Sequence, residues 1–352
     1  MNQADFDSLL DRHEAFLHRR KVGKPLIGYW AGGYYPVEQF PRGTSRWRPG
    51  QLIRPDDLRF EAFREDYQNL YRIHDQLTDD FFYIGSAYWG IPWLEAIMGC
   101  AVYAGKTSAW TKPCLERPAP PELRDGDLDK NPWFTCLLQF TKELVDFAHE
   151  RFPVCAPLLR GAGDVAAAMR GTETFVLDLI DSPGAGKDLL EVCATVRMQV
   201  LARLKAVIPP WRQTHAAGGY PSRVWSKKTV AYYQEDCAAY LNPDIFREFI
   251  LPVARKMAAA AEVNFMHLHS GCLYPVDILL EDGTNDIIEI NIDHEGAAPP
   301  LRQLLGVFKK IQHSGKALLL WGQMSDDDLA YLSQELEPAG LSLQPIWNPA
   351  ER

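Results

Sequence analysis

Two histidines at alternate positions of one short apolar run, His267 and His269, are the residues of this sequence best suited to chemistry. Such alternation predicts a β-strand, so both imidazoles leave the strand on one face and the apolar residues beside them leave on the other. The next apolar run carries Glu289 and Asp293, which share a face for the same reason. Because burying such groups without partners is costly, they predict either a reaction site or a buried polar network.

An imidazole beside a carboxylate is suited to acid–base catalysis, because the carboxylate orients a histidine that exchanges protons near neutral pH. In this interpretation His267 and His269 are the acid–base residues and Asp293 orients one of them. Asp236, at the end of an earlier apolar run, is a further catalytic candidate, since its neighbour Glu235 must leave the strand on the opposite face. The alternative for Asp293 is an ordinary helix-capping role.

The same residue types can bind a metal ion. Zinc takes imidazole, thiolate and carboxylate ligands in proteins, and His267, His269, Cys272 and Glu289 make one such set. Zinc is therefore a candidate cofactor. The alternative without a metal is that the histidines are hydrogen-bonded core residues and Cys272 is a small buried apolar residue.

Candidate substrate-binding residues share positions near the ends of predicted strands: Tyr29, Trp30, Tyr34, Trp89, Trp93, Arg160 and Gln323. The aromatic members could form a pocket wall for a flat, apolar or cationic molecule, or could be packing beneath a loop. Arg160 could anchor a substrate anion or form an internal ion pair with Asp164. Gln323 could orient a ligand or only satisfy a loop.

Eight apolar runs predict the strands that would carry these residues: 25–32, 80–86, 154–160, 229–236, 264–271, 286–293, 316–323 and 341–345. Amphipathic runs of helical period lie between most of them: 61–77, 134–151, 188–207, 243–262 and 300–315. Strands that alternate with helices predict parallel pairing through right-handed crossovers. Eight such units favour a closed (β/α)8 TIM barrel, although an open doubly wound sheet stays open as an alternative. Barrel chemistry gathers at the C-terminal ends of the strands, so we expect the site at the barrel mouth.

Composition predicts one soluble domain over residues 1–352, with an N-terminal helical segment over about 1–24. Of the 352 residues, 47% are hydrophobic, and the formal charge is −9. An acidic chain without a basic run argues against nucleic acid as a partner. No apolar stretch is long enough for a membrane span, and the charged start lacks a signal core, so we expect a cytoplasmic protein. The seven scattered cysteines predict mostly reduced thiols, and residues 112–131 predict a long surface loop.

Three segments together resemble the uroporphyrinogen decarboxylase superfamily: residues 170–179, residues 241–249 and the Leu-His-Ser-Gly-Cys turn at 268–272. The resemblance extends from about Pro25 to Gln344 and implies a (β/α)8 barrel. The decarboxylase's own site departs from the match, because Tyr29 and Gly33 stand where its two substrate-binding arginines are expected. A substrate with many carboxylates needs those arginines, so turnover of uroporphyrinogen is not expected.

The corrinoid-linked methyltransferase branch of this superfamily is the nearer resemblance. Its members activate a thiol on zinc held by His-x-Cys and a distant cysteine. Here His269 matches the histidine, Gly271 stands at the cysteine position with Cys272 one residue later, and no cysteine follows. The resemblance implies a methyltransferase-type enzyme for a small methylated or aromatic molecule, with a corrinoid protein as partner. A metal-independent decarboxylase or lyase using His and Asp, and a degenerate barrel that only binds a ligand, stay open as alternatives.

Overall fold

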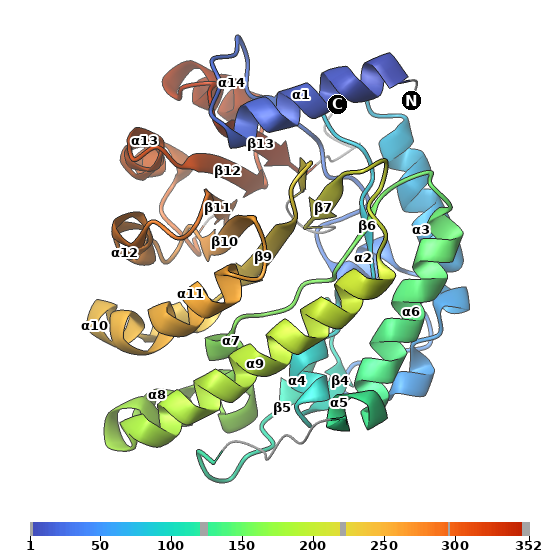
Figure 1. Cartoon of the computed structure of the whole chain (residues 1–352), viewed down its shortest axis with the longest axis vertical. Coiled ribbons are helices and arrows are strands. Elements are labelled where there is room, and N and C mark those ends of the chain that lie inside the picture. The colour runs from blue at the N-terminus through green and yellow to red at the C-terminus, as the bar shows by residue number, and fades with distance from the viewer. Residues whose placement is uncertain (1–2, 120–125, 219–222, 295, 347–352) are drawn as a thin grey trace.

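A six-stranded parallel sheet forms the centre of the chain in the computed structural model, which describes residues 3–119, 126–218, 223–294 and 296–346 (Figure 1). Its strand order is β1-β13-β12-β11-β10-β9, and every neighbouring pair is parallel. The strands are β1 (Leu26–Ile27), β9 (Val230–Gln234), β10 (Val263–His269), β11 (Ile287–Ile292), β12 (Ala317–Gly322) and β13 (Leu341–Pro345). The chain is therefore a mixed α/β protein with a parallel sheet, as the sequence predicts.

A second parallel pair, β3 (Gly85–Ser86) with β6 (Val154–Cys155), is separate from this sheet. Single main-chain bonds lie at the two gaps, from the Asp80 N–H to the Ile27 oxygen and from the Gly161 N–H to the Gln234 oxygen. Within the described residues the strand ladders do not close into a continuous barrel. The predicted closed barrel is thus found only in its coarser form, a parallel sheet with helices around it.

The first three predicted strands are much shorter than expected, with two ladder residues each. Glycine and proline explain two of these differences. Gly28 lies so close to Phe81 that a Cβ would come within 1.9 Å of the Phe81 ring, and Pro157 cannot donate to a ladder. Three antiparallel strands absent from the prediction are β2 (Leu52–Ile53), β4 (Ala101–Ala104) and β5 (Ala109–Lys112), and two more are β7 (His215–Ala217) and β8 (Val224–Ser226).

Helices follow most strands and cover the outer face of the sheet (Figure 1). The longer ones are α1 (Gln3–Leu17), α3 (Phe60–Asp75), α6 (Pro132–Ala148), α7 (Ala162–Arg170), α8 (Thr172–Asp181), α9 (Pro183–Val207), α11 (Leu251–Ala258), α12 (Pro275–Asp282), α13 (Leu305–His313) and α14 (Asp326–Glu335). Short turns are α2 (Pro36–Gln39), α4 (Trp93–Ile97), α5 (Asp127–Lys130), α10 (Pro243–Ile245), η1 (Pro55–Asp57), η2 (Asp236–Tyr240), η3 (Phe246–Ile250) and η4 (Leu301–Leu304). The predicted helix 243–262 ends earlier, at Ala258, and contains the π-turn η3. The predicted loop 112–131 holds α5, and its residues 120–125 lie outside the described residues.

Alternation along the strands divides the core into two apolar layers. Met266, Leu268 and Ile288 pack between the sheet and its helices. Phe265 and Ile287, on the opposite face, belong to a separate inner cluster that also includes residues of β1, β9, β12 and α1. The predicted alternation of 264–271 and 286–293 is therefore confirmed, and it places His267 and Glu289 on the inner face.

The N-terminal ends of the strands are covered by α1, and Arg223 lies buried beside β13 and the segment that follows β1. Phe16 of α1 lies in the inner cluster, and the ring of His13 meets Phe81 edge-on. Arg223 is 1% exposed, and its guanidinium donates to the main-chain oxygens of Tyr29 and Phe82. The inner face is thus filled on this side and carries polar groups toward the other.

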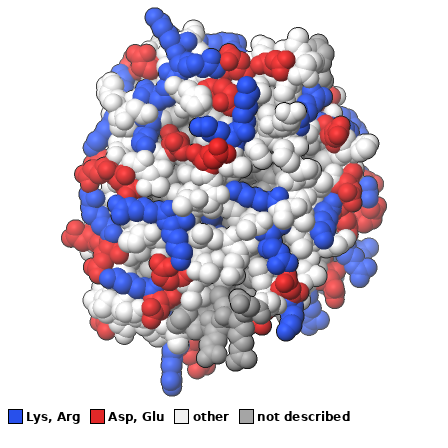
Figure 2. Space-filling view, in the orientation of Figure 1, with Lys and Arg blue, Asp and Glu red and all other residues white. Residues whose placement is uncertain are grey.

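Acidic and basic side chains are interspersed over the face of the molecule in Figure 2, and neither sign forms an extended patch there. Among the described helices, none is both long and apolar enough to cross a membrane.

Candidate functional site

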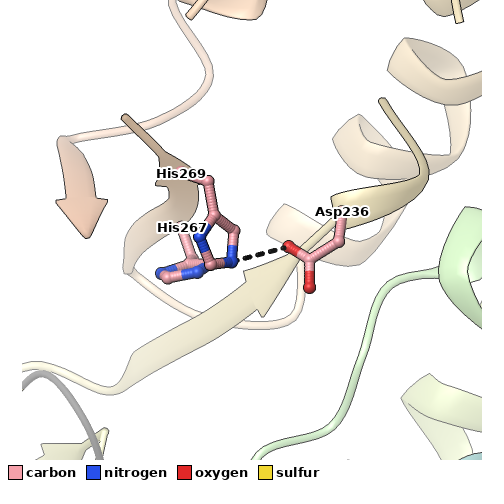
Figure 3. Close-up of side chains that lie close together, drawn as sticks. All are labelled: Asp236, His267 and His269. Atoms are coloured by element: carbon pink, nitrogen blue, oxygen red, sulfur yellow. Dashed lines mark ion pairs between the residues drawn. The ribbon is translucent and has the colours of Figure 1, made fainter. Parts of the chain in front are cut away.

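Three side chains converge at the C-terminal ends of β9 and β10: Asp236, His267 and His269. We call the C-terminal ends of β9, β10, β11 and β12 the carboxyl edge of the sheet. One ligand-type atom from each of the three residues lies within 4.8 Å of the others. His269 Nε2 is 3.8 Å from Asp236 Oδ1, and the two side chains point toward each other (Figure 3). Asp236 and the two histidines come from separate predicted strands, so the fold brings together groups that are about 30 positions apart in sequence.

Each histidine is held by a carboxylate through Nδ1. His267 Nδ1 is 2.6 Å from Glu289 Oε2, and His269 Nδ1 is 2.6 Å from Asp293 Oδ1. The two imidazole rings lie 4.8 Å apart at 87°. A carboxylate at Nδ1 fixes the orientation of the ring and leaves Nε2 as the nitrogen that can act on a ligand.

The two pairs differ in burial. The side chains of His267 and Glu289 are 4% and 0% exposed, whereas those of His269 and Asp236 are 40% and 38% exposed. His267 is therefore a buried support, and His269 faces solvent at the carboxyl edge. This difference decides which histidine a dissolved molecule can reach.

Asp293 is anchored by the turn that follows β10. Its Oδ2 accepts from the main-chain N–H of Gly271 and from the Ser270 hydroxyl, while its own N–H donates to Ser270 Oγ at 2.9 Å. Burial raises the pKa of Asp293, but the hydrogen bond and charge of His269, together with the hydrogen bonds from Gly271 and Ser270, outweigh burial, and the net pKa is lowered. Asp293 is thus held as a carboxylate against His269.

His269 gains charge stabilisation from the acidic groups around it. Burial alone lowers its pKa, but the Asp293 hydrogen bond and the nearby charges of Asp236, Asp293 and Glu289 raise it to about 9. In the protein without a bound cation, His269 is therefore an imidazolium at neutral pH.

Two aromatic rings border this group. Tyr34 stacks on Trp321 with ring centroids 6.1 Å apart, and Trp321 lies 6.1 Å from the ring of His267. Asn291 Nδ2 is 3.4 Å from the Tyr34 hydroxyl and 3.4 Å from Asp293 Oδ1. Of the predicted aromatic wall, Tyr34 is the member that these contacts place beside the histidines.

Arg160 lies near the same edge in a cluster of acidic groups. Its Nη1 donates to Glu95 Oε1 at 3.1 Å, and its side chain is 40% exposed while that of Glu95 is 1% exposed. Burial lowers the pKa of Arg160, but the charges of Glu95, Asp164 and Asp236 raise it overall. The internal ion pair predicted for Arg160 exists, with Glu95 as the hydrogen-bonded partner rather than Asp164.

Other predicted residues lie away from this group. Trp93 is fully buried in the outer core, where its Nε1 donates to the Tyr88 oxygen, and Trp30 lies in the inner cluster beneath Arg223. Both are packing residues, because their rings are surrounded by core side chains. Trp89 donates to Gln39 Oε1, and the Tyr29 N–H donates to Asp79.

Gln323 and Cys272 also stand apart. Gln323 Oε1 is 3.4 Å from His294 Nδ1 on the exposed side. Cys272 lies outside the group made by Asp236, His267 and His269. Glu289 contacts Nδ1 of His267 and is not one of the three residues whose ligand-type atoms lie close together.

A second buried group lies beneath the edge: Asp164, Glu235 and Cys237. Glu235 Oε2 accepts from the N–H groups of Gly163 and Asp164 at the start of α7. Burial raises the pKa of Glu235 well above its usual range, and burial with the charge of Asp236 raises that of Asp164 to about 7. Glu235 thus contacts the start of α7, whereas Asp236 contacts Gln234 and lies beside His269.

Sequence reasoning missed several residues of the site. Trp321 shares the face of Gln323 on one strand, and Gln234, which donates to Asp236 Oδ2 at 2.6 Å, shares the face of Asp236. Strand alternation would have found both. Glu95 gives no such signal, because it comes from a short turn between irregular segments.

A cavity of about 180 Å³ lies elsewhere, between the start of β6, the start of β9 and the C-terminal half of α9. Its walls are largely apolar and include Cys155, Leu201 and Ile208. None of the three converging side chains lines it, so it is separate from the chemistry of the carboxyl edge.

The fold has solved counterparts. A methyltransferase from Methanosarcina mazei matches 96% of this chain and 92% of its own, with a TM-score of 0.63 and 12% sequence identity. The Bacillus subtilis mannanase BCman matches 99% of this chain and 88% of its own, with a TM-score of 0.41 and 10% identity, and the Bacillus subtilis mannanase man26 matches at 0.40 and 10%. By sequence, the chain matches no protein-family model and no curated protein. The first likeness therefore establishes a shared fold with a methyltransferase.

Proposed function

We propose that this protein is a methyltransferase-type enzyme that acts on a small molecule at the carboxyl edge, where Asp236, His267 and His269 converge. The observation that carries the proposal is the pair of histidines whose Nδ1 atoms are each held by a carboxylate at 2.6 Å. One ligand-type atom from each of Asp236, His267 and His269 lies within 4.8 Å of the others, and a carboxylate at Nδ1 leaves the Nε2 of each histidine available to a ligand. The fold shared with a methyltransferase supports the same proposal.

The donor set fits zinc. Two imidazoles and one carboxylate are ligands that zinc takes at catalytic sites, which keep a further position open for water or substrate. Gln234 orients Asp236, and Glu289 orients His267, so all three ligands have supports. This set replaces Cys272 and Glu289 of the sequence-based set with Asp236. When bound there, zinc would hold a thiol as a thiolate at neutral pH.

Other residues of the chain would orient the ligands and contact the substrate. Asp293 holds the His269 ring, and the turn Ser270–Gly271 holds Asp293. Tyr34 and Trp321 offer a stacked aromatic side to a methylated or aromatic substrate. Arg160, partly exposed and fixed by Glu95, offers a cation close enough to Asp236 for their charges to interact.

The proposal includes the closed eight-stranded barrel that the sequence predicts. The main-chain bonds Asp80 to Ile27 and Gly161 to Gln234 lie at the two gaps between the six-stranded sheet and the β3–β6 pair. They support a ring of eight strands in chain order, and the carboxyl edge is then the barrel mouth. A corrinoid protein as the methyl-donating partner is part of the proposal through the resemblance.

Elemental analysis and a methyl-transfer assay test it together. We expect about one zinc per purified chain, lost in His269→Ala and Asp236→Ala and retained in Cys272→Ser, which alters a nearby thiol outside the ligand set. Free methylcobalamin with a panel of small thiols would report methyl transfer through the visible spectrum of the corrinoid. Zinc absent from the parent after loading, together with unchanged methylcobalamin, would overturn the proposal.

A metal-independent lyase or decarboxylase is the second candidate, favoured by the position of His269 between Asp293 and Asp236. That geometry holds an imidazole as a proton donor without any metal. Activity that survives exhaustive chelation and is lost in His269→Ala would favour this candidate over methyl transfer.

A further inference from the structure

Two cysteines outside the group of Asp236, His267 and His269 form a close pair of thiols. Cys100 Sγ and Cys114 Sγ are 3.4 Å apart, and neither is in a disulfide. Cys100 immediately precedes β4 and Cys114 follows β5 by one residue, so the pair lies at the open end of the β4–β5 hairpin.

Main-chain contacts on both sides hold the two sulfurs in place. The Cys100 N–H donates to the Glu95 oxygen at the end of α4, and the N–H groups of Cys114 and Leu115 both donate to the Met169 oxygen of α7. Four antiparallel residue pairs, from Ala101 opposite Lys112 to Ala104 opposite Ala109, fix the hairpin between them. A disulfide needs the sulfurs to close to about 2 Å, a movement that side-chain rotation can supply without separating these anchors.

The two thiols differ in access. Cys100 is 2% exposed, whereas Cys114 is exposed to solvent. The hydrogen bond from Cys100 lowers the pKa of Cys114 to about 7, while burial raises the pKa of Cys136, Cys155, Cys193, Cys237 and Cys272. An exposed thiol that ionises readily, beside a buried partner, has the arrangement of an attacking and a resolving cysteine.

We propose that Cys100 and Cys114 are a peroxide-sensitive dithiol that closes to an intrachain disulfide at the base of the β4–β5 hairpin. The Cys114 thiolate attacks one oxygen of hydrogen peroxide, the O–O bond breaks, and Cys114 sulfenic acid and water form. Cys100 sulfur then attacks the Cys114 sulfur, the S–O bond breaks, and a second water leaves. The two sulfurs lose two electrons in total, which reduce one peroxide to two waters.

Peptide mapping of the full-length protein tests the proposal. The reduced protein is treated with a few equivalents of hydrogen peroxide, alkylated and digested with trypsin without reductant. Cleavage after Lys106 separates the two cysteines, so the disulfide appears as two linked peptides that reductant releases. We expect this species to form before the other five cysteines are modified, and to be absent in Cys114→Ser but present in the matched control Cys136→Ser.

Two further readouts distinguish outcomes. In Cys100→Ser, Cys114 should stop at the sulfenic acid and be trapped by dimedone. The oxidised parent should melt a few degrees higher than the reduced parent, because the bond closes a loop. Linked peptides that never form in the parent, with Cys114 passing to sulfonic acid or with Cys272 reacting first, would overturn the proposal. Neither result depends on the metal or on methyl transfer.

Discussion

At the scale of single residues, the sequence predicts His267 and His269 as acid–base or metal-binding residues, and their surroundings make them different. His267 is buried against a buried carboxylate, whereas His269 is the partly exposed member beside Asp293 and Asp236. Alternation along a strand predicts that both face inward, but it contains no information on depth. Depth follows from the neighbouring strands, which sequence reasoning could not place.

This difference predicts unequal costs of replacement. His269→Ala should abolish zinc binding or activity and lower the free energy of unfolding by less than His267→Ala does, since the His269 side chain is partly solvated. His267→Ala removes the partner of Glu289 Oε2 in the interior and should cost about 2–4 kcal/mol. Urea unfolding of both variants beside the parent measures this. A larger loss for His269→Ala, with activity kept, would make His269 a structural residue.

A second prediction at this scale concerns Tyr29 and Gly33, which stand where the decarboxylase is expected to have its two substrate-binding arginines. Gly33 has φ of +109°, and a Cβ there would come within 2.6 Å of Glu38 Cβ, so Gly33→Arg cannot restore the decarboxylase pattern. We expect neither the parent nor Tyr29→Arg to convert uroporphyrinogen, as chromatography of anaerobic reaction products would show. Coproporphyrinogen formed at about 1 per second or faster would contradict this.

A third prediction at this scale concerns Tyr34 and the ligand preference of the proposed site. We expect methoxy-aromatic compounds and methylated amines to raise the melting temperature more than polycarboxylates do, because rings favour flat or cationic groups. Tyr34→Ala should lose most of that rise in a thermal-shift screen. Tyr331→Ala, which removes a ring stacked by Arg302 on an outer helix, should keep it. Stabilisation by polycarboxylates alone would contradict the preference.

At the scale of elements, strands β9 to β13 were predicted well and the first three strands were not. In β10 and β11 polar residues alternate with apolar ones, β12 is a run of apolar residues, and nearly every residue of the three strands is buried. The earlier ones are interrupted by glycine and proline, and the hairpins β4–β5 and β7–β8 follow no apolar period long enough to recognise. The converging residues were therefore mostly predictable, while Glu95 and Arg223, which come from these irregular parts, were not.

The end of β12 contains a close approach that only glycine allows. Gly322 has φ of +131°, and a Cβ there would lie 2.6 Å from the Ile292 oxygen and 3.0 Å from Asn291 Oδ1. Gly322→Ala should therefore lower the free energy of unfolding by at least about 2 kcal/mol. Gly306→Ala is the matched control, because Gly306 is helical with open space around it, and it should stabilise by about 0.5–1 kcal/mol. If Gly322→Ala and Gly306→Ala changed the free energy of unfolding equally in urea unfolding, the main chain at Gly322 would not be constrained by its close neighbours.

At the scale of the whole molecule, fully buried histidines tie folding to pH. Burial lowers the pKa of His13 to about 4 and, with the charge of Arg223, that of His74 to about 3. In the unfolded chain both histidines become protonated near pH 6.5. The free energy of unfolding therefore falls as the pH drops below about 6.5, and it goes on falling until the pH reaches the pKa of each histidine in the folded protein. The raised pKa values of Asp164 and Glu235 act in the opposite sense, so a single group is best isolated by comparing variants.

His74→Gln isolates one of them. Between about pH 7.5 and about pH 5.5 the parent should lose about 1.4 kcal/mol more unfolding free energy than the variant. His18→Gln is the control, because the His18 side chain is 53% exposed, and it should follow the parent. Parallel curves for parent and His74→Gln would mean that His74 does not stay neutral in the folded protein.

The buried Arg223 also bears on how reactants travel. It packs against the rings of Trp30 and Phe81, and the Gln344 side chain pairs with both its main-chain N–H and its main-chain oxygen, so Arg223 is fixed against the inner face of β13. In the proposed function, reactants enter and leave over the carboxyl edge, where the His269 and Asp236 side chains are partly exposed. In a two-step group transfer, donor and acceptor would then bind one after the other by the same route, and a slowly released product would compete with the next reactant for the site.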